Sequence, residues 1–516
     1  MKKTIFLLAF AALAFLWGCN EDKGNYNYTP IDDIGISGIE NKYSVLSFEE
    51  TLRIAPTVET DIPEGELEYL WLCYNTSNAK VADIDTLARS RNLDFAMALA
   101  PGNYVLTYGV RDKRNDYTVY KNVALESITR FSRGFYVLKE NAGGDTDMDL
   151  HIDMENKAED LLERSLGAPL DGKPTRLGLN MGYSFIDKET NGLTDGQVLL
   201  PMSEKDVRTM RISDMSQIYD FEEMMFGGVG EDERPYFAVR GGWSAFLVTS
   251  KGVYSSATYY EMGQYSSGKF GLPTQPEGVS RFVVGTPSLY GGLFYFDETN
   301  GRFISVDMNG YGHTFSNSSG PGLPQPNGIK HTCLALDLFY TGAVGTLPMA
   351  VFQDADDPAR KLVYVMKVSM MNYANPIDKV IPLGPDVNSS KGVRFAFGAK
   401  NTRMLYSMTA DNKLYCYDIE GVRETPVTLA GIAGDEEVTY MAHKFWSGKQ
   451  DTPNHFDYFV VATHKAGAYK VYMYEMNGGQ PLGNPRVTLE GAGKVRDMQY
   501  VSPSAVMTDD LQAFNP

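Results

Sequence analysis

Pairs of short apolar segments recur along roughly the C-terminal three quarters of this chain, from about residue 130 onward. In several of them, two runs rich in aromatic and β-branched residues flank a polar turn, such as Asp297–Gly301 or Asp411–Lys413. Such runs are typical of strands, and antiparallel sheets repeated about every 40–60 residues are typical of a β-propeller. The clearest segments are Gly134–Ile152, Trp243–Ala257, Gly291–Asp307, Lys361–Val368, Asn401–Ile419 and Asp457–Met476.

The number of blades follows from counting these segments. Adding a weaker pair near Val198–Ile212 predicts about seven blades, although irregular spacing leaves six or eight open. The isolated strand Val495–Ser502 is predicted to complete the first blade and close the ring, which would remove an exposed sheet edge. The segment Glu204–Met225 is expected to carry a short helix on a rim loop. Residues 129–516 are therefore assigned to the propeller.

Residues 35–128 have the pattern of a small immunoglobulin-like β-sandwich. Trp71 lies at the centre of the strand-like run Leu67–Asn75, and Tyr104 follows a Pro-Gly turn at the start of a later strand. A core tryptophan followed by such a tyrosine is typical of this sandwich and its tyrosine corner. Tyr117–Leu125 is expected to be the last strand. The chain is thus predicted to be all-β.

The N-terminus has the pattern of a secretory signal. A basic start precedes the apolar run Thr4–Trp17, whose 14 residues are too few to span a bilayer comfortably. The sequence Leu-Trp-Gly-Cys resembles the bacterial lipoprotein box, which makes residues 1–18 the signal peptide and Cys19 the lipidation site. Glu21 and Asp22 resemble a surface-export signal, and residues 19–34 are expected to form a flexible tether. An ordinary cleaved signal with a chance cysteine is the alternative.

Charge and cysteine content exclude some classes. The formal charge is −18, and removal of Lys2 and Lys3 with the signal makes it −20, so nucleic acid is an unfavourable partner. Cys73, Cys333 and Cys416 form no Cys-x-x-Cys pair and are predicted to be buried thiols.

The order of these features resembles that of the PKD-like surface lipoproteins of Bacteroidetes. The most specific stretches are Asp22–Tyr26, after the anchor, and Gly134–Lys139, at the propeller start. The resemblance implies an accessory outer-membrane lipoprotein of a SusC/SusD-type nutrient uptake system. Its implied partners are a TonB-dependent transporter and a SusD-like lipoprotein. The resemblance implies no cofactor and brings no catalytic residues.

One acidic motif is a weak candidate for a calcium site. Asp145, Asp147 and Asp149 alternate as at the start of a calcium loop, but Leu150 replaces the required glycine and Asn156 replaces the bidentate glutamate. On a strand, alternate aspartates share one face, so we expect an exposed hairpin edge rather than a metal site.

Catalytic motifs are weak, and binding has slightly better support. The six histidines form no His-Glu-x-x-His pair, and no Gly-x-Ser-x-Gly is present. Trp243 follows two glycines, and Trp446 lies in a polar stretch between strands, so both are candidate ligand-binding residues, with packing against their own blades as the alternative. The sequence thus predicts a non-catalytic binding lipoprotein for a glycan or peptide. A propeller-based glycoside hydrolase or lyase, or a structural spacer, remains open.

Overall fold

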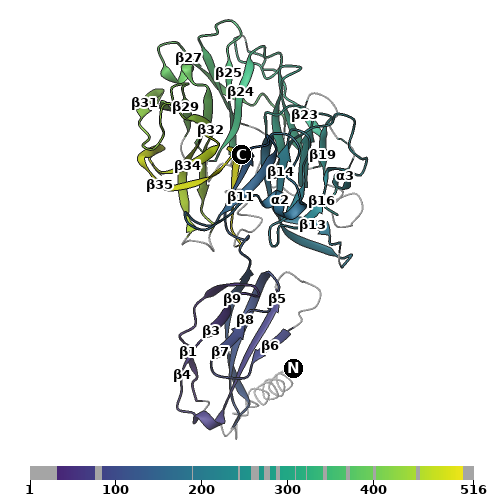
Figure 1. Cartoon of the computed structure of the whole chain (residues 1–516), viewed down its shortest axis with the longest axis vertical. Helices are drawn as coiled ribbons and strands as arrows, with labels where there is room; N and C mark the ends of the chain where they lie inside the picture. The colour runs from purple at the N-terminus through teal and green to yellow at the C-terminus, as the bar shows by residue number, and fades with distance from the viewer. Residues whose placement is uncertain are drawn as a thin grey trace, which may run out of the picture. The chain divides into compact units, whose positions relative to one another are not determined.

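A computed structural model places most of the chain (Figure 1). The structure describes residues 32–75, 84–188, 190–241, 244–256, 267–271, 273, 279–285, 291–307, 309–320, 322–340, 346–367, 372–398, 403–448 and 454–503. Cys19, Glu21, Asp22 and Trp243 lie outside these ranges, so the roles assigned to them stay predictions. Within the described ranges, no helix is long and apolar enough to cross a membrane. The chain divides into two compact units, residues 1–127 and 128–516.

The first unit is a β-sandwich, as the sequence predicts. Its larger sheet has the order β2-β9-β8-β5-β6, and its smaller pairs are β3-β7 and β1-β4. Trp71 is fully buried and its ring lies 4.4 Å from that of Tyr108. The Tyr104 hydroxyl donates to the carbonyl of Ala100 at 2.9 Å, which confirms the tyrosine corner. The elements are β1 (Gly35–Ser37), β2 (Lys42–Leu46), β3 (Thr51–Ile54), β4 (Thr57–Glu59), the 3₁₀ helix η2 (Glu64–Glu66), β5 (Leu67–Asn75), β6 (Ile84–Ala88), β7 (Leu93–Ala96), β8 (Gly102–Asp112) and β9 (Tyr117–Ile128).

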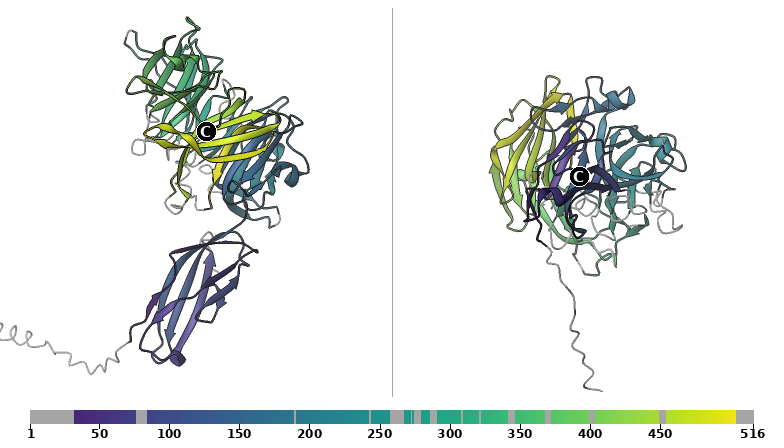
Figure 2. Two further views of the ribbon diagram at one scale, coloured as in Figure 1. Left: turned by 60° about the vertical axis from the view of Figure 1, so that its left-hand side comes forward. Right: turned by 90° about the horizontal axis from the view of Figure 1, so that it is seen from below.

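The second unit contains seven antiparallel sheets within the described residues (Figures 1 and 2). From the innermost strand outward they are β36 (Lys494–Val501), β10 (Gly134–Glu140), β11 (Thr146–His151) and β12 (Lys157–Ala158); β13 (Pro174–Ile186), β14 (Leu193–Ser203), β15 (Thr209–Arg211) and β16 (Gln217–Tyr219); β17 (Pro235–Gly241), β18 (Ser244–Thr249) and β19 (Val253–Ser255); β20 (Val283–Gly285), β21 (Gly291–Asp297), β22 (Arg302–Asp307) and β23 (Gly312–Thr314); β24 (Thr332–Tyr340), β25 (Thr346–Gln353), β26 (Lys361–Met366) and β27 (Ile377–Leu383); β28 (Arg394–Phe397), β29 (Met404–Met408), β30 (Leu414–Asp418) and β31 (Arg423–Val427); and β32 (Glu437–Trp446), β33 (Phe456–Lys465), β34 (Ala468–Asn477) and β35 (Gln480–Ala492).

The last strand closes the ring, as the sequence predicts. Strand β36 pairs antiparallel with β10, from Gly134 opposite Val501 to Glu140 opposite Lys494. In Figure 1 the yellow C-terminal strand accordingly lies beside the blue strands of the first sheet. The innermost strands β36, β13, β17, β20, β24, β28 and β32 contact one another in succession, and β32 returns to β36. The unit is therefore a closed seven-bladed β-propeller.

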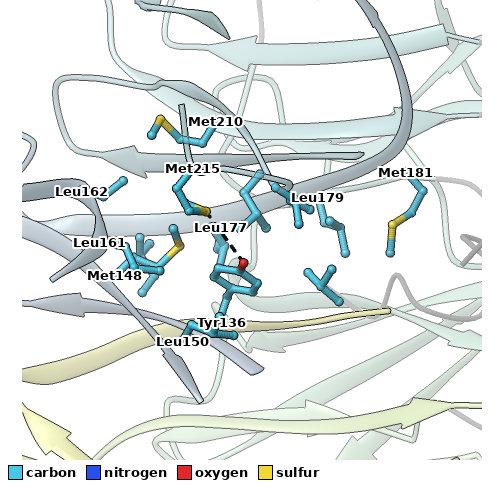
Figure 3. Packing of buried hydrophobic residues seen from close by; sticks show 14 of the residues in the cluster. Tyr136, Met148, Leu150, Leu161, Leu162, Leu177, Leu179, Met181, Met210 and Met215 are labelled. Carbon is cyan, nitrogen blue, oxygen red and sulfur yellow. Dashed lines mark hydrogen bonds between the residues drawn. The ribbon is translucent and has the colours of Figure 1, made fainter. Parts of the chain in front are cut away.

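The apolar cores lie between blades. Seven buried clusters are found in the described part of this unit, one between each pair of neighbouring sheets. Figure 3 shows the cluster between the first two blades, where Tyr136, Met148 and Leu177 meet Met215. The Tyr136 hydroxyl donates to the carbonyl of Phe131 at 2.6 Å, which satisfies its one polar atom. Because the cores occupy the spaces between sheets, the ring centre is left to other residues.

Two smaller expectations are also confirmed. Within 204–225 the helix α3 (Phe221–Met224) forms, capped by reciprocal hydrogen bonds between Asp220 and Glu223. The thiols of Cys73, Cys333 and Cys416 are free and buried, and burial raises the pKa of Cys73 and of Cys416 to about 12. The remaining helices of the described second unit are α2 (Leu161–Leu166) and the 3₁₀ helix η3 (Asn388–Lys391).

Removing β36 should therefore destabilise the whole second unit. A chain that ends at Gly493 leaves the edge of β10 unpaired and the ring open, so we expect loss of the cooperative thermal transition of this unit, measured by circular dichroism. A chain that ends at Pro503 retains β36 and is the matched control. An unchanged transition midpoint in the shorter chain would contradict the role of β36 in closure.

Candidate functional site

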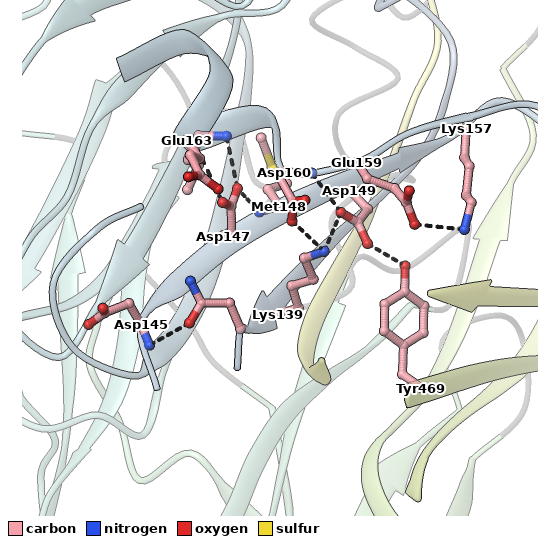
Figure 4. Close-up of polar contacts among 12 residues, drawn as sticks. Lys139, Asp145, Asp147, Met148, Asp149, Lys157, Glu159, Asp160, Glu163 and Tyr469 are labelled. Atoms are coloured by element: carbon pink, nitrogen blue, oxygen red, sulfur yellow. Dashed lines mark hydrogen bonds and ion pairs between the residues drawn. The ribbon is translucent and has the colours of Figure 1, made fainter. Parts of the chain in front are cut away.

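Two of the three alternating aspartates, Asp147 and Asp149, do not lie on an exposed hairpin edge, so the prediction is wrong for them, whereas Asp145 lies half-buried in the turn before β11. Strand β11 lies inside the first sheet, and Asp147 and Asp149 are both 0% exposed. Asp145 accepts a hydrogen bond from the backbone N–H of Gly172 at 3.0 Å. Asp147 accepts one from the backbone N–H of Leu162 at 2.9 Å, at the start of α2. Figure 4 shows the carboxylates of Asp147 and Asp149 as hydrogen-bond acceptors inside the fold.

Asp149 joins the first blade to the last. Its Oδ1 lies 2.6 Å from Nζ of Lys139, and its Oδ2 accepts a hydrogen bond from the Tyr469 hydroxyl at 2.7 Å. Lys139 is itself 2% exposed. Burial alone would lower the pKa of this amine, but the carboxylates of Asp149 and Asp160 raise it. A buried charge is tolerated only when an opposite charge pairs with it. The buried Lys139 ammonium therefore requires the carboxylates of Asp149 and Asp160.

His151 completes this joint between blades. Its Nε2 lies 2.8 Å from the hydroxyl oxygen of Tyr469. Because the single Tyr469 proton is donated to Asp149, Nε2 of His151 carries a proton and donates to Tyr469. Burial lowers the pKa of His151 to about 4, so the ring is neutral at physiological pH.

The acidic motif thus offers no metal site in this arrangement. Across the described residues, no group of three or more His, Cys, Asp or Glu side chains is placed to hold a metal ion. Asp145, Asp147 and Asp149 do not converge on one point, because each carboxylate faces a different internal partner.

Trp446 is not placed to bind a ligand, which corrects its candidacy. It ends strand β32 instead of lying in a loop, and it is 1% exposed. Its ring packs in the apolar cluster of the first two blades, 5.9 Å from the ring of Tyr500. The polar residues adjacent to Trp446 in the sequence therefore do not indicate its environment in the fold.

A cavity of about 830 Å³ lies where the innermost strands begin. Its walls come from β13, β17, β24, β28, β32 and β36 and from the residues just before β20, so every blade contributes. The volume falls within the range of roughly 300–1,000 Å³ that small-molecule sites occupy. Apolar side chains such as Tyr236, Phe282 and Phe395 are part of this lining.

Five arginines from five different blades line this cavity: Arg176, Arg234, Arg281, Arg394 and Arg496. In the part of the chain that the structure describes, none of them forms an ion pair with a carboxylate. Arg394 makes one long hydrogen bond, 3.4 Å, to the carbonyl of Thr439. Arg176 and Arg281 lie over the rings of Phe237 and Phe282, at 5.5 and 5.2 Å. Their donors are thus available to a ligand.

Two of these arginines have lowered pKa values. Arg496 is exposed, and the surrounding protein together with the nearby Arg176 lowers its pKa. Burial likewise lowers the pKa of Arg394. A lowered pKa means that the cationic form of the arginine is disfavoured. A bound anion would stabilise that form.

Acidic groups share the cavity with the arginines. Glu204, Glu298, Asp337 and Asp497 also line it. Both oxygens of Asp497 are used, accepting from the N–H groups of Met498 and Leu177 at 2.8 Å each. Burial raises the pKa of Asp337 to about 7, although Arg176 and Lys444 act in the opposite direction. Asp337 can therefore exchange a proton near neutral pH.

A tyrosine hydroxyl in the cavity wall lacks a partner. The hydroxyl of Tyr440 is buried, and among the described residues nothing hydrogen-bonds to it. Burial raises its pKa well above the ordinary value, so this group stays protonated and can donate a hydrogen bond. Such an unsatisfied buried group is costly and is satisfied by a bound ligand or water.

The sequence reasoning missed this cavity, although a signal for it exists. Each of the five arginines lies near the start of an innermost strand. Three of them are among the first three residues of the strand, and two lie one or two residues before it. They stand in Thr-Arg-Leu, Glu-Arg-Pro, Ser-Arg-Phe, Val-Arg-Phe and Val-Arg-Asp. Once the innermost strands are assigned, an arginine is found near the start of the innermost strand in five of the seven blades. Without that assignment, these five dispersed residues look unrelated.

Comparisons with known proteins assign the N-terminal part of the chain to a family. The PKD-like family profile matches residues 19–174, so the N-terminal part of the chain is PKD-like. No curated protein matches the chain. A quinoprotein alcohol dehydrogenase-like protein from Bacteroides thetaiotaomicron has a TM-score of 0.42 at 12% identity, over 90% of this chain and 97% of that chain. A DUF4784 family protein from Bacteroides caccae has a TM-score of 0.31 at 10% identity, over 77% and 95%. Such distant likenesses carry no functional argument.

The blade joint predicts a specific loss of stability in acid. His151 has a pKa of about 4 in the fold and about 6.5 when unfolded, so its contribution is complete above pH 6.5 and is lost as pH falls toward 4. The difference corresponds to about 3 kcal/mol. A His151→Gln variant retains a donor for Tyr469, and its urea unfolding free energy should fall less over this window than that of the natural protein.

A second histidine provides the control for this measurement. His464 lies outside the blade joint and is 27% exposed, so His464→Gln is the matched substitution against which the His151→Gln profile is compared. Parallel pH profiles for the natural protein and the His151→Gln variant would contradict the proposed contribution.

Proposed function

We propose that this protein is a cell-surface lipoprotein that binds an anionic nutrient in its central cavity. In this role it is a non-catalytic accessory component of a TonB-dependent, SusC/SusD-type uptake system. The observation that carries the proposal is the set of five cavity arginines, which form no ion pair among the described residues.

The charge pattern supports binding of an anion. The chain as a whole carries −18, yet arginines outnumber carboxylates in the cavity lining by five to four. Among the described residues these guanidinium groups form no ion pair with the carboxylates of the lining, so a carboxylate, sulfate or phosphate of a ligand could accept their charge-assisted hydrogen bonds. Walls of low dielectric strengthen that attraction relative to an exposed surface.

The sequence supports the location and the partners. Cys19 follows a lipoprotein box, and Glu21 and Asp22 follow the cysteine as in surface-exported lipoproteins. The family match over residues 19–174 agrees with the PKD-like part of the resemblance. The partners in this proposal are the outer membrane, a TonB-dependent transporter and a SusD-like lipoprotein.

Neutralising two cavity arginines should abolish tight binding of anions. We expect saturable, salt-sensitive binding of at least one polyanionic pool (acidic polysaccharides or acidic peptides) by isothermal titration calorimetry, and none of its neutral counterpart. The Arg176→Gln/Arg496→Gln double variant should bind at least about tenfold more weakly, because each lost charged hydrogen bond costs roughly 1.5–3 kcal/mol.

The control for this variant lies on the outer edge of the last blade. Arg486, on β35, is 70% exposed, and Arg486→Gln should bind as the natural protein does. Failure of every anionic pool to bind would contradict the proposed function. Appearance of shortened or unsaturated products during the incubation would instead favour the hydrolase or lyase alternative, with Asp337 as the proton donor.

Membrane attachment should depend on one residue. A Cys19→Ala variant cannot receive the acyl chains, so we expect it to be absent from the outer-membrane fraction and to incorporate no radiolabelled palmitate. The natural protein should be labelled and should be cleaved by protease added to intact cells. A Cys73→Ala variant, which removes a buried thiol, is the matched control. Membrane retention of Cys19→Ala would contradict the anchor.

A further inference from the structure

The cavity combines two kinds of recognition chemistry at close range. Arginine forks bind planar carboxylates through two parallel hydrogen bonds. Carboxylate side chains accept hydrogen bonds and repel a simple anion. Because five arginines and four carboxylates line the same cavity without pairing in the described structure, a matching ligand must present both acidic groups and hydrogen-bond donors.

We infer that the central cavity binds an acidic carbohydrate, a uronate-containing oligosaccharide whose carboxylates meet the arginines and whose hydroxyls meet Asp337 and Tyr440. This inference rests on the proposed function and names the chemical class of its ligand. It chooses the glycan over the peptide, both of which the sequence left open.

The acceptor and donor groups match sugar hydroxyls. Oδ1 of Asp337 accepts from the backbone N–H of Leu338 at 2.7 Å, while its other oxygen has no partner within the described ranges. The Tyr440 hydroxyl has none either. A sugar hydroxyl both donates and accepts, so neighbouring hydroxyls of one ring can serve an aspartate oxygen and a tyrosine O–H together.

The balance of charge argues against densely charged ligands. One excess arginine in the lining suits a ligand with few carboxylates, and Glu298 and Asp497 would repel a heavily sulfated or phosphorylated chain. A uronate chain carries one carboxylate per acidic ring, separated by hydroxyls. Its spacing of charge therefore fits a cavity of mixed sign.

The aromatic residues of the lining fit the same ligand. Tyr236, Phe282 and Phe395 provide ring surfaces beside the arginines. Sugar rings have apolar C–H faces that pack on aromatic side chains.

A panel of matched probes tests this inference by calorimetry at pH 8, where Asp337 is mostly ionised. The acidic probes are oligogalacturonate, alginate oligosaccharides, hyaluronan oligosaccharides and hexaglutamate. The neutral probe is methyl-esterified oligogalacturonate, and inorganic sulfate is the simple anion. We expect at least one uronate oligosaccharide to bind about tenfold or more tightly than hexaglutamate, sulfate and the neutral probe.

The Asp337→Asn variant separates hydroxyl recognition from simple anion binding. It removes a negative charge with little change of shape. Binding of the uronate oligosaccharide should therefore become about threefold weaker or more, while binding of hexaglutamate and of sulfate should stay unchanged or become stronger. Circular dichroism confirms that the variant folds. A Tyr440→Phe variant should likewise show weaker binding of the oligosaccharide only.

The outcomes distinguish this inference from the proposed function. Hexaglutamate binding as tightly as every uronate probe, or stronger uronate binding by Asp337→Asn, overturns the acidic-carbohydrate assignment and leaves an anion-binding protein. Absence of binding by all uronate probes also overturns it. The proposed function falls if no polyanionic pool binds, or if the arginine double variant binds the pool as tightly as the natural protein does.

Discussion

The pairing of β36 with β10 is the constraint on which the second unit depends. A sheet edge exposes unpaired N–H and C=O groups, and a ring of sheets escapes this cost at its seam only if the chain ends are joined. Here the last strand of the chain becomes the innermost strand of the first blade. The seam is reinforced by the Asp149 carboxylate, which binds Lys139 in its own blade and Tyr469 in the neighbouring one.

Closure also determines where polar residues can gather. Each blade buries both faces against its neighbours, so the apolar side chains are buried in seven clusters between sheets. The innermost strands then bring their first residues to one end of a central space. Residues as distant in sequence as Arg176 and Arg496 interact there, and each blade adds one position to the same wall. A cavity of this kind is built by the ring and exists in no single blade.

The sequence was informative where local pattern and burial coincide. Strands such as β10, apolar at consecutive positions, reveal sheets covered on both faces, and Trp71 and Tyr104 reveal a sandwich through a local contact. The same reasoning failed for Asp147 and Asp149. It assumed that acidic residues on a strand face water, whereas Lys139 and the start of α2 compensate them inside the fold.

The candidate site was invisible for a related reason. Its residues are separated by about 50–100 positions, and none stands in a motif of its own, so only the ring brings them together. Trp446 shows the reverse error, because polar neighbours in sequence suggested a loop where the structure has a strand end packed against Tyr500. Local patterns identify elements, but they do not show which distant side chains the ring will place opposite one another.

In the proposed function, an acidic protein recognises anions at short range through a cavity of mixed charge. At physiological salt the Debye length is about 8 Å, so the exterior charge is largely screened for an approaching ligand, while groups in contact with a bound ligand are not. The negative exterior therefore gives little electrostatic steering toward the cavity, and the arginines act after entry. Discrimination then depends on whether the ligand can satisfy Arg176 and Arg496 and also donate to Asp337. Under these conditions, mixed charge in the wall selects for the arrangement of groups on a ligand more strongly than for its total charge.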